Sequence, residues 1–457
     1  MLNTRKGLSI LFFFACAAMA TFCSYAEQAE VLPAKISHSD GRESWMLLDK
    51  NHSTKSMLDT EHSFTIHCEE AIASLYLVWD RHPGGWKLLT EHSETLLGND
   101  AFIHEFITLD TPVTELTIQL NSDAVLCDIY PLGPGATPDW AQHWQPPLQK
   151  ADFLLLPTHA DDEHLFFGGI MSKYIDSGHS VQVAYMVNHN TEPYRPHELL
   201  NGLWAVGIKN YPVIPSFPDV FSDSLAHAKT IYPEQEIISY QVDLIRRFRP
   251  QVIVGHDLNG EYGHGAHMLN AHSLLTSVEL ADEYHRTPKL YLHLYGQNEV
   301  FLDYDIPLKR FDGKTAFEMA VLGFSKHLSQ QTYFQMEKAG PYDCRKFGLA
   351  RTTVGPDQHK DDLFENLLSY AEQDSLSSPA PFLPSSAGSA VSAPNLADDL
   401  PNALPDALKE TIPSVTPIDR KPFAATVFLS ASLILTATLL FGKRLYLSKK
   451  QRKGDRK

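Results

Sequence analysis

The chain has 457 residues, which is long enough for two or three domains, and 43% of them are hydrophobic, which excludes disorder throughout. The formal net charge of −17 at pH 7 argues against a nucleic-acid partner, because binding to phosphates needs an excess of basic side chains. Only residues 443–457 are strongly basic.

The N-terminus has the features of a secretory signal. Arg5 and Lys6 precede an apolar run, and Ser24 and Ala26 are small residues at positions −3 and −1 of a cleavage site. We therefore expect residues 1–26 to be a signal peptide. The alternative is an N-terminal anchor that is not cleaved.

Residues 27–148 alternate short apolar runs with turn residues and contain no long helical pattern. The clearest strand-like runs are 64–68, 74–79, 116–120 and 125–130. We expect a small β-sandwich accessory domain, which either binds carbohydrate or acts as a spacer. Trp79, Trp86 and Trp140 form either a stacking platform for a sugar or part of the core.

Three cysteines lie outside the signal: Cys68, Cys127 and Cys344. Cys68 and Cys127 both fall in strand-like runs of the β-rich region, so a disulfide between them is one possibility and unpaired thiols are the other. No Cys-x-x-Cys zinc pattern occurs.

The pattern changes to alternating strands and helices in the next region, residues 149–370. Predicted strands are 153–156, 181–187, 213–217, 252–254 and 289–294, and predicted helices are 165–177, 196–206, 234–248 and 268–281. This alternation predicts an α/β fold with a mostly parallel sheet and right-handed crossovers.

The pattern of the C-terminal part predicts a stalk, a membrane span and a tail. Residues 371–421 are rich in Ser, Pro and Ala, and we expect a disordered stalk there. Residues 422–442 are apolar over the length of a transmembrane helix, with a buried core helix as the alternative. The basic tail 443–457 would stay in the cytoplasm, so the expected topology is a single-pass cell-membrane protein with its N-terminal ectodomain outside.

The first chemically informative motif is His159-Ala160-Asp161-Asp162-Glu163, which follows the predicted strand 153–156 directly. It lies where a strand ends and a helix begins, the edge at which open α/β sheets bind ligands. Adjacent carboxylates repel each other, and a divalent metal would offset that cost. A solvated loop is the alternative for this motif taken alone.

A second motif follows the predicted strand 252–254 and contains His256, His264 and His267, with His272 a little further on. Because parallel strands end at one edge of their sheet, this loop is expected to face the first motif. Two loops that bring histidine and carboxylate ligands together are typical of catalytic zinc. We interpret His256 and His272 as structural residues rather than ligands.

Together the two loops resemble the PIG-L/LmbE-like zinc-dependent N-deacetylases. The similarity covers about residues 150–300 and not the β-rich region or the stalk. It is carried by His159-Ala160-Asp161-Asp162-Glu163, Gly168-Gly169, Gly178-His179-x-Val181, Arg195-x-x-Glu198, Gly207 and Gly260-x-Tyr262-Gly263-His264-x-x-His267. The resemblance implies a Rossmann-like fold, one zinc ion and removal of acetyl groups from N-acetylglucosamine-type amides.

The resemblance also implies roles for single residues. His159, Asp162 and His267 correspond to the zinc ligands. Asp161 corresponds to the general base, and His264 to the residue that stabilises the oxyanion or protonates the leaving amine.

Further residues are expected to support the site. The resemblance points to Arg195 and Asp219 as substrate-binding residues, with a surface salt bridge as the alternative for Arg195. Glu163 is expected either to cap the following helix or to orient His159.

Two positions depart from the family pattern. Ala160 replaces the usual proline of the first motif, which affects only loop stiffness. Ala266 replaces an aspartate that orients the residue corresponding to His264. Either Glu261 or Asp257 takes over that contact, or the substrate supplies it, or turnover is reduced.

The sequence therefore predicts a zinc-dependent amide hydrolase that removes the N-acetyl group from an acetamido sugar in an extracytoplasmic glycan or glycolipid. The alternative is a catalytically impaired carbohydrate-binding surface protein that keeps the deacetylase fold. The predicted fold class is a Rossmann-like, mostly parallel α/β sheet preceded by a small all-β sandwich and followed by one transmembrane helix. The oligomeric state stays open.

Overall fold

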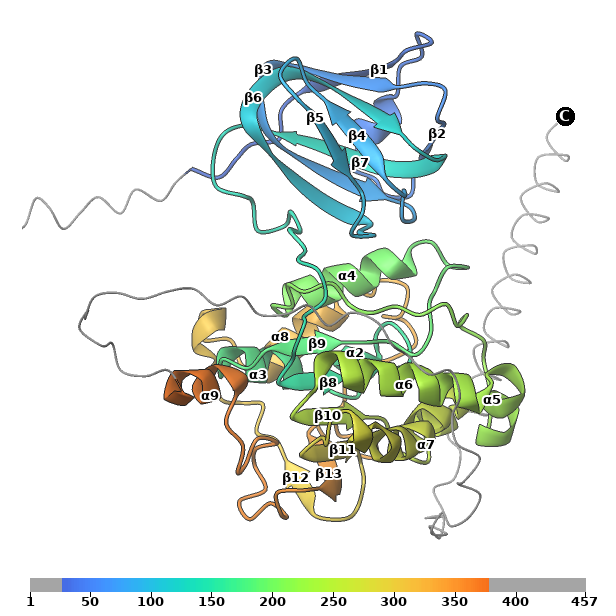
Figure 1. The fold of residues 1–457 in the computed structure, drawn as a ribbon, viewed down its shortest axis with the longest axis vertical. Coiled ribbons are helices and arrows are strands. Elements are labelled where there is room, and N and C mark those ends of the chain that lie inside the picture. The colour runs from blue at the N-terminus through green and yellow to red at the C-terminus, as the bar shows by residue number, and fades with distance from the viewer. Residues whose placement is uncertain (1–26, 378–457) are drawn as a thin grey trace, which may run out of the picture. The chain divides into compact units, whose positions relative to one another are not determined.

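The computed structural model describes residues 27–377, which divide into two compact units (Figure 1). The β unit contains residues 27–147, 189–211 and 326–328, and the α/β unit contains residues 148–188, 212–325 and 329–377. The predicted signal peptide, cytoplasmic tail and most of the stalk lie outside the described residues.

Within residues 27–377, no helix combines the length and apolar character needed to cross a membrane. The segment 422–442, for which we predicted a transmembrane helix, lies outside the described residues. The transmembrane helix of the predicted fold class therefore has no support in the structure.

The β unit is built on seven antiparallel strands that belong to a single hydrogen-bonded sheet. Their order is β2-β7-β3-β6-β4-β5, and β1 pairs with β3. The strands are β1 (Ala34–His38), β2 (Ser56–Leu58), β3 (Phe64–Trp79), β4 (Trp86–Leu89), β5 (Glu94–Leu97), β6 (His104–Leu120) and β7 (Ala124–Leu132), with a 3-10 turn η1 (Trp45–Leu48) between β1 and β2.

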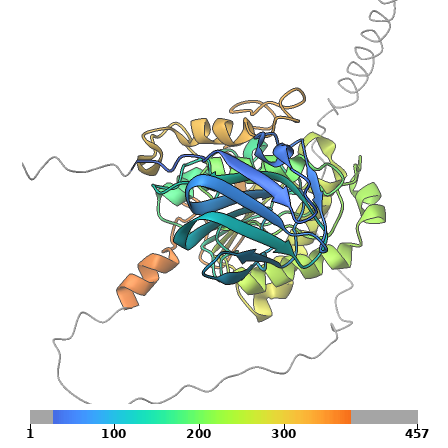
Figure 2. The ribbon, with the colours of Figure 1, turned by 90° about the horizontal axis from the view of Figure 1, so that it is seen from above.

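The predicted two-sheet sandwich is wrong. The prediction broke β3 at residues 69–73, but the strand runs on through them with register shifts on either side of Ile72, whose side chain is fully buried. Irregularities of this kind let a long strand bend without ending. β3 and β6 have 16 and 17 residues, and each is long enough to pair with more than one strand. All seven strands therefore belong to one sheet, which curls over its own core (Figure 2).

The three cysteines are all buried and free, so the disulfide alternative does not hold. Burial raises the pKa of Cys68 to about 11 and that of Cys127 to about 12. The thiols are therefore packing residues and not nucleophiles at neutral pH.

The tryptophans divide between the two alternatives. Trp79 and Trp86 are fully buried, and both indole N–H groups donate to Glu105 Oε2, at 3.1 and 3.0 Å. They are core residues. Trp140 is 47% exposed and packs against Tyr76 and Tyr130.

Helix α4 (Arg195–Ala205) belongs to the β unit. Its His197 Nδ1 lies 2.9 Å from Nε2 of His104 on β6, and His104 Nδ1 lies 2.7 Å from the hydroxyl of Tyr76. Burial lowers the pKa of His197 to about 4, so this chain of hydrogen bonds runs between neutral rings. His197 also lies near Asp80 and Cys127 at a spacing that a metal ion requires. The ammonium group of Lys55 already pairs with Asp80 there, which opposes a cation.

The α/β unit contains a six-stranded sheet of order β12-β13-β11-β10-β8-β9. Its strands are β8 (Phe153–Leu155), β9 (Val181–Val183), β10 (Val252–Gly255), β11 (Lys289–His293), β12 (Glu299–Phe301) and β13 (Lys346–Thr352). The pairings β8–β9, β8–β10 and β10–β11 are parallel, whereas β11–β13 and β12–β13 are antiparallel.

The sheet is thus mixed, and the prediction of a mostly parallel sheet is wrong. The prediction contained no strand after residue 294. β13 lies more than fifty residues beyond β11, and its partly exposed end has a weak apolar pattern. Its position between β12 and β11 depends on a distant pairing with β11, which periodicity along the chain cannot detect.

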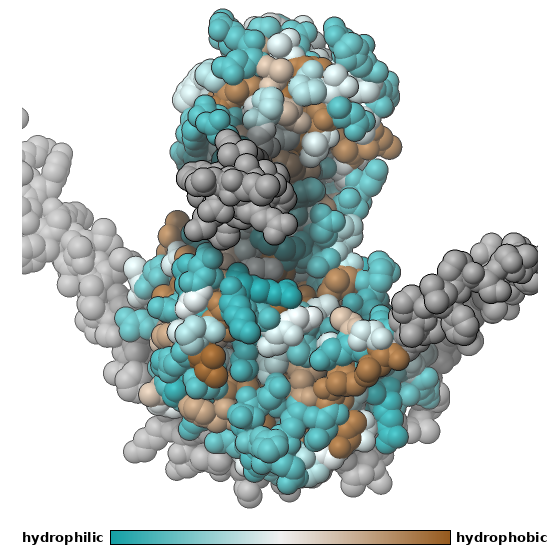
Figure 3. All heavy atoms as spheres, turned by 90° about the vertical axis from the view of Figure 1, so that its left-hand side faces the viewer, coloured by the Kyte–Doolittle hydropathy of each residue, from teal (hydrophilic) through white to brown (hydrophobic). Residues whose placement is uncertain are grey.

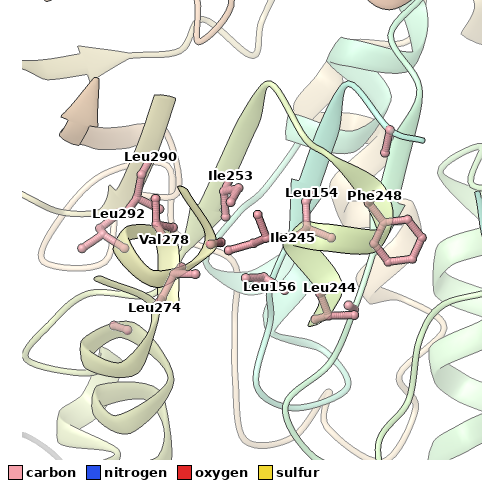
Figure 4. Packing of buried hydrophobic residues seen from close by; sticks show 14 of the residues in the cluster. Leu154, Leu156, Leu244, Ile245, Phe248, Ile253, Leu274, Val278, Leu290 and Leu292 are labelled. Atoms are coloured by element: carbon pink, nitrogen blue, oxygen red, sulfur yellow. The ribbon is translucent and has the colours of Figure 1, made fainter. Parts of the chain in front are cut away.

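Helices cover both faces of this sheet. They are α2 (Asp162–Leu165), α3 (Ile170–Asp176), α5 (Leu225–Ile231), α6 (Glu234–Phe248), α7 (Gly265–Leu280), α8 (Ala316–Phe324) and α9 (Tyr370–Ser377), with 3-10 turns η2 (Glu261–Gly263), η3 (Ala281–Glu283) and η4 (Lys309–Phe311). On one face, Leu154 and Ile253 of the sheet pack with residues of α6 and α7 (Figure 4). On the other face, the ring of Phe153 stacks on Tyr174 of α3.

This alternation along β8 explains why a short strand is so strongly buried. Successive side chains point to opposite faces, and each face meets a helix. On the surface drawn in Figure 3, exposed hydrophobic residues are scattered among hydrophilic ones.

Candidate active site

The candidate site lies where β8 and β10 end, within the α/β unit. These strands are parallel neighbours, with Leu155 opposite Val254, so the loops that follow them leave the same edge of the sheet. The first loop continues into α2, and the second passes through η2 into α7. Both predicted motifs therefore come together although about a hundred residues separate them.

Three of the predicted metal ligands converge on one point. Nδ1 of His159 lies 3.2 Å from Oδ2 of Asp162 and 3.0 Å from Nε2 of His267, and that nitrogen lies 3.2 Å from the same oxygen. The three donor atoms form a nearly equilateral triangle. All three side chains are almost fully buried.

This triangle fits a metal ion. Ligand atoms at about 2.0–2.1 Å from a tetrahedral zinc lie about 3.3 Å apart, close to the spacing seen here. Two imidazole nitrogens and one carboxylate oxygen also form a donor set of the catalytic zinc type, which leaves a fourth position open. The residues present therefore fit such an ion.

His256 lies close to this triangle but is held by another contact. Its Nε2 is 3.4 Å from Asp162 Oδ2, yet the same nitrogen accepts the backbone N–H of Thr158 at 2.9 Å. Its lone pair is thus already used, as expected for a structural histidine. His272 contacts the carbonyl oxygen of Leu258 at 3.2 Å and lies outside the triangle.

Asp161 has a strained backbone at the start of α2. Its φ of 114° lies in the left-handed region, which is unfavourable for a residue with a side chain. Its N–H donates to Glu163 Oε2 at 2.8 Å, and Glu163 is fully buried. Strain of this kind persists only where surrounding contacts hold it. Glu163 therefore supports the conformation of the loop that carries Asp161 and Asp162.

His264 packs against the metal triangle through its ring. The ring centroids of His159 and His267 lie 4.7 and 4.9 Å from that of His264. Among residues 27–377, none hydrogen-bonds the His264 ring. Burial, and then the neighbouring His159, lower the pKa of His264 to about 2, so the ring is neutral at physiological pH.

Glu261, one of the two residues expected to replace the missing aspartate, accepts the backbone N–H of His264 at 3.1 Å through its carbonyl oxygen, but its carboxylate faces other rings. Glu261 binds His267, His256 and His293 instead. The methyl group of Ala266 is fully buried in an apolar cluster with Met186, Leu269 and their neighbours. An aspartate at position 266 would therefore bury a carboxylate among apolar side chains.

The two predicted substrate-binding residues differ in their placement. Oδ1 of Asp219 lies 3.5 Å from Nε2 of His159, which places Asp219 directly behind a predicted metal ligand. Arg195 begins α4, is buried and belongs to the β unit. Substrate binding by either residue stays a prediction.

Charge is strongly coupled within the site. Although burial favours the neutral ring, Asp162 and Glu261 raise the pKa of His267 to about 10. Although burial favours the neutral carboxyl, His267 and His159 hold the pKa of Asp162 well below its usual value. In the metal-free protein, protonated His267 thus supplies the positive charge beside the Asp162 carboxylate.

Sequence reasoning missed three features of the site. One is Glu261 as a contact of three histidines, and another is His293, which comes from the more distant strand β11. The third is Tyr262, whose φ of 55° is left-handed and whose ring packs on Tyr342. Glu261 lies six residues before His267, and this short spacing was a signal for the contact between them. Nothing in the local sequence pointed to His293.

Known proteins support the family seen in the motifs. Residues 154–278 match the PIG-L family, GlcNAc-PI de-N-acetylase. The matched segment contains both motifs and lies within the region of the predicted resemblance. No curated protein matches the chain.

Several solved structures are similar. The conserved protein TT1542 from Thermus thermophilus is 20% identical, with 40% of this chain and 82% of that chain covered and a TM-score of 0.31. An N,N'-diacetylchitobiose deacetylase from Pyrococcus horikoshii is 16% identical, with coverages of 40% and 72% and a TM-score of 0.29. A pectin-binding carbohydrate-binding module is 14% identical, with coverages of 24% and 96% and a TM-score of 0.18.

We predict that zinc binding releases a proton and strengthens with rising pH. A zinc ion must displace the proton of His267, whose pKa is about 10 in the metal-free protein. Between pH 6 and 8 the zinc dissociation constant should fall about tenfold per pH unit, with about one proton released. Calorimetric titrations in buffers of different ionisation enthalpy measure both quantities, and a pH-independent affinity would contradict the assignment of His267.

Proposed function

We propose that the α/β unit is a zinc-dependent N-deacetylase that removes the acetyl group from an acetamido sugar of the N-acetylglucosamine type. The observation that carries this proposal is the triangle of His159, Asp162 and His267, with Asp161 and His264 beside it, inside a PIG-L domain. When bound, zinc polarises the amide carbonyl and makes water a better nucleophile.

Asp161 is the proposed general base. In the reaction, a water oxygen bonds to the acetyl carbon, the C–N bond breaks with its electron pair going to nitrogen, and that nitrogen takes a proton. Asp161 accepts the proton from the water and returns it to the departing amine, so acetate and a free amino sugar are released. Its neighbour Asp162 would hold the metal.

His264 is proposed to stabilise the oxyanion as a neutral hydrogen-bond donor. Because burial lowers its pKa to about 2, the ring is neutral near pH 7 and does not act as a cationic acid towards the amine. A metal held by His159 and His267 would add positive charge nearby and keep the pKa of His264 low. A neutral imidazole N–H aimed at the developing oxyanion still lowers the barrier.

Replacing Asp161 by asparagine tests this function. We expect Asp161→Asn to lower kcat by about 10²-fold or more, because the proton acceptor is lost, while zinc stays bound. The assay is acetate release from N-acetylglucosamine oligomers and glycolipids, with zinc content measured in the same samples. Asp243→Asn, on an exposed part of α6, is the matched control and should keep full activity. Unchanged turnover in Asp161→Asn would rule out this mechanism.

Phe221 is proposed to contact the sugar ring. It is 63% exposed, and its ring centroid lies 5.4 Å from that of His264. The preceding residues are held in place, because the hydroxyl of Tyr232 donates to the carbonyl of Pro218 and accepts from the N–H of Val220. An aromatic face fixed beside the reacting group can stack on the apolar face of a pyranose.

Removing the Phe221 ring should therefore weaken substrate binding more than chemistry. We expect Phe221→Ala to raise KM about tenfold with kcat changed by less than about threefold, and Phe221→Tyr to restore KM. Tyr284→Ala removes an equally exposed aromatic ring at the end of η3 and is the control. A change in kcat alone would contradict a stacking role.

The substrate is proposed to lie outside the cytoplasm. This part rests on the signal-like residues 1–26 alone, and wall glycans, exopolysaccharides or glycolipids are then the candidate substrates. N-terminal sequencing of the mature protein should begin at Glu27, and a mature protein that retains Met1 would contradict a cleaved signal peptide. Digestion of intact cells by an added protease separates the remaining cases, because a protein that stays protected would contradict a location outside the cytoplasm.

The second candidate function is a carbohydrate-binding protein with impaired catalysis. It is favoured by the His264 ring, which has no hydrogen-bond partner among residues 27–377. The two functions separate in one assay. Glycan binding without acetate release by the wild-type, zinc-loaded protein would support the second candidate and exclude the first.

A further inference from the structure

We propose that Glu261 is a positioning residue of this site: it fixes the orientation of the metal ligand His267 and, through His256, anchors the loop that carries His159 and Asp162. This inference rests on the proposed zinc site but concerns how the chain builds it.

Glu261 is fully buried and accepts four hydrogen bonds within the α/β unit. Oε2 accepts from Nδ1 of His256 at 2.8 Å and from Nδ1 of His267 at 2.9 Å. Oε1 accepts from Nδ1 of His293 at 2.7 Å and from the backbone N–H of Asp257 at 3.2 Å. A buried carboxylate is tolerated only when its lone pairs are filled in this way.

The contact with His267 decides which nitrogen faces the metal position. Because Glu261 is an acceptor, the proton that His267 would keep when it binds a metal is the one on Nδ1. Nε2, which faces Nδ1 of His159 and Oδ2 of Asp162, is then the nitrogen that would bind the metal. A carboxylate behind a ligating histidine also makes the ring a stronger ligand.

The contact with His256 joins the two loops of the site. His256 donates from Nδ1 to Glu261, so its Nε2 accepts, and it receives the backbone N–H of Thr158. Thr158 directly precedes His159. The chain Glu261–His256–Thr158 therefore connects the loop after β10 to the loop after β8. The rings of His256 and His267 are stacked with their centroids 4.1 Å apart, so both rings present Nδ1 to the same oxygen of Glu261.

The third imidazole occupies the other oxygen of Glu261. Nδ1 of His293 lies 2.7 Å from Oε1 of Glu261, and its Nε2 lies 3.2 Å from the carbonyl oxygen of Asp343. His293 is fully buried and is held between these two groups. It thus fixes Oε1 of Glu261, while Oε2 contacts His267 and His256.

The test compares Glu261→Gln with a matched variant of another buried glutamate. Glutamine keeps the shape of Glu261, but its amide cannot accept from three imidazoles. We expect zinc affinity, measured by chelator competition, to fall about 10–100-fold. In zinc-free protein, hydrogen exchange of the Thr158 amide should become faster, a readout that requires no metal and no activity.

Glu105→Gln in the β unit is the control. Glu105 also accepts three N–H groups, from Trp79, Trp86 and Gly98, so its replacement carries a comparable folding cost. It should leave zinc affinity and Thr158 exchange unchanged. If Glu261→Gln does not fold, Glu261→Asp and His256→Gln should show the same changes to a smaller degree.

The outcomes separate this inference from the proposed function. Unchanged zinc affinity and unchanged Thr158 exchange in Glu261→Gln overturn the positioning role, even if the wild-type protein releases acetate. Weaker zinc binding and faster exchange in a protein that never releases acetate support the role and overturn the deacetylase. A wild-type protein that binds no zinc overturns both.

Discussion

The parallel pairing of β8 with β10 is the constraint on which the site depends. It places the ends of two strands, separated by about a hundred residues, next to each other at one edge of the sheet. The loops that leave this edge carry every proposed metal ligand. Packing of α6 and α7 on one face and of α3 on the other keeps both strands buried, so the edge cannot shift without disturbing the core.

Charge is the second constraint, because four carboxylates lie within or next to this edge. Asp162 meets two imidazoles, Glu261 meets three, and Glu163 accepts a backbone N–H from Asp161. Such a cluster is stable only when each acid has a fixed partner. The histidines therefore have two roles. Some face the metal position, and others donate hydrogen bonds to the carboxylate that holds a ligating histidine in place.

The prediction of the fold was accurate where periodicity is local and wrong where pairing is distant. The helices of residues 234–248 and 268–281 and the strands next to the two motifs were predicted within a few residues. The sandwich was wrong because Glu69 and Glu70 interrupt the apolar pattern, whereas β3 continues through them and is paired with β6 on both sides of them. The mixed sheet was missed because β13 joins the sheet through an antiparallel pairing with β11 that no short-range pattern encodes.

By itself, the sequence determined the composition of the site: a histidine and two aspartates after one strand, and two histidines at the start of a helix after another. These residue types at this spacing suffice to predict a metal and the PIG-L resemblance, because the chemistry of the ligands is local. Only the tertiary structure decided which side chains contact one another. It assigned Glu261 to His267 and His256, placed Asp219 behind His159, and brought His293 from β11 into the network. Those assignments depend on distances between side chains from different strands, and such distances exist only once the sheet has formed.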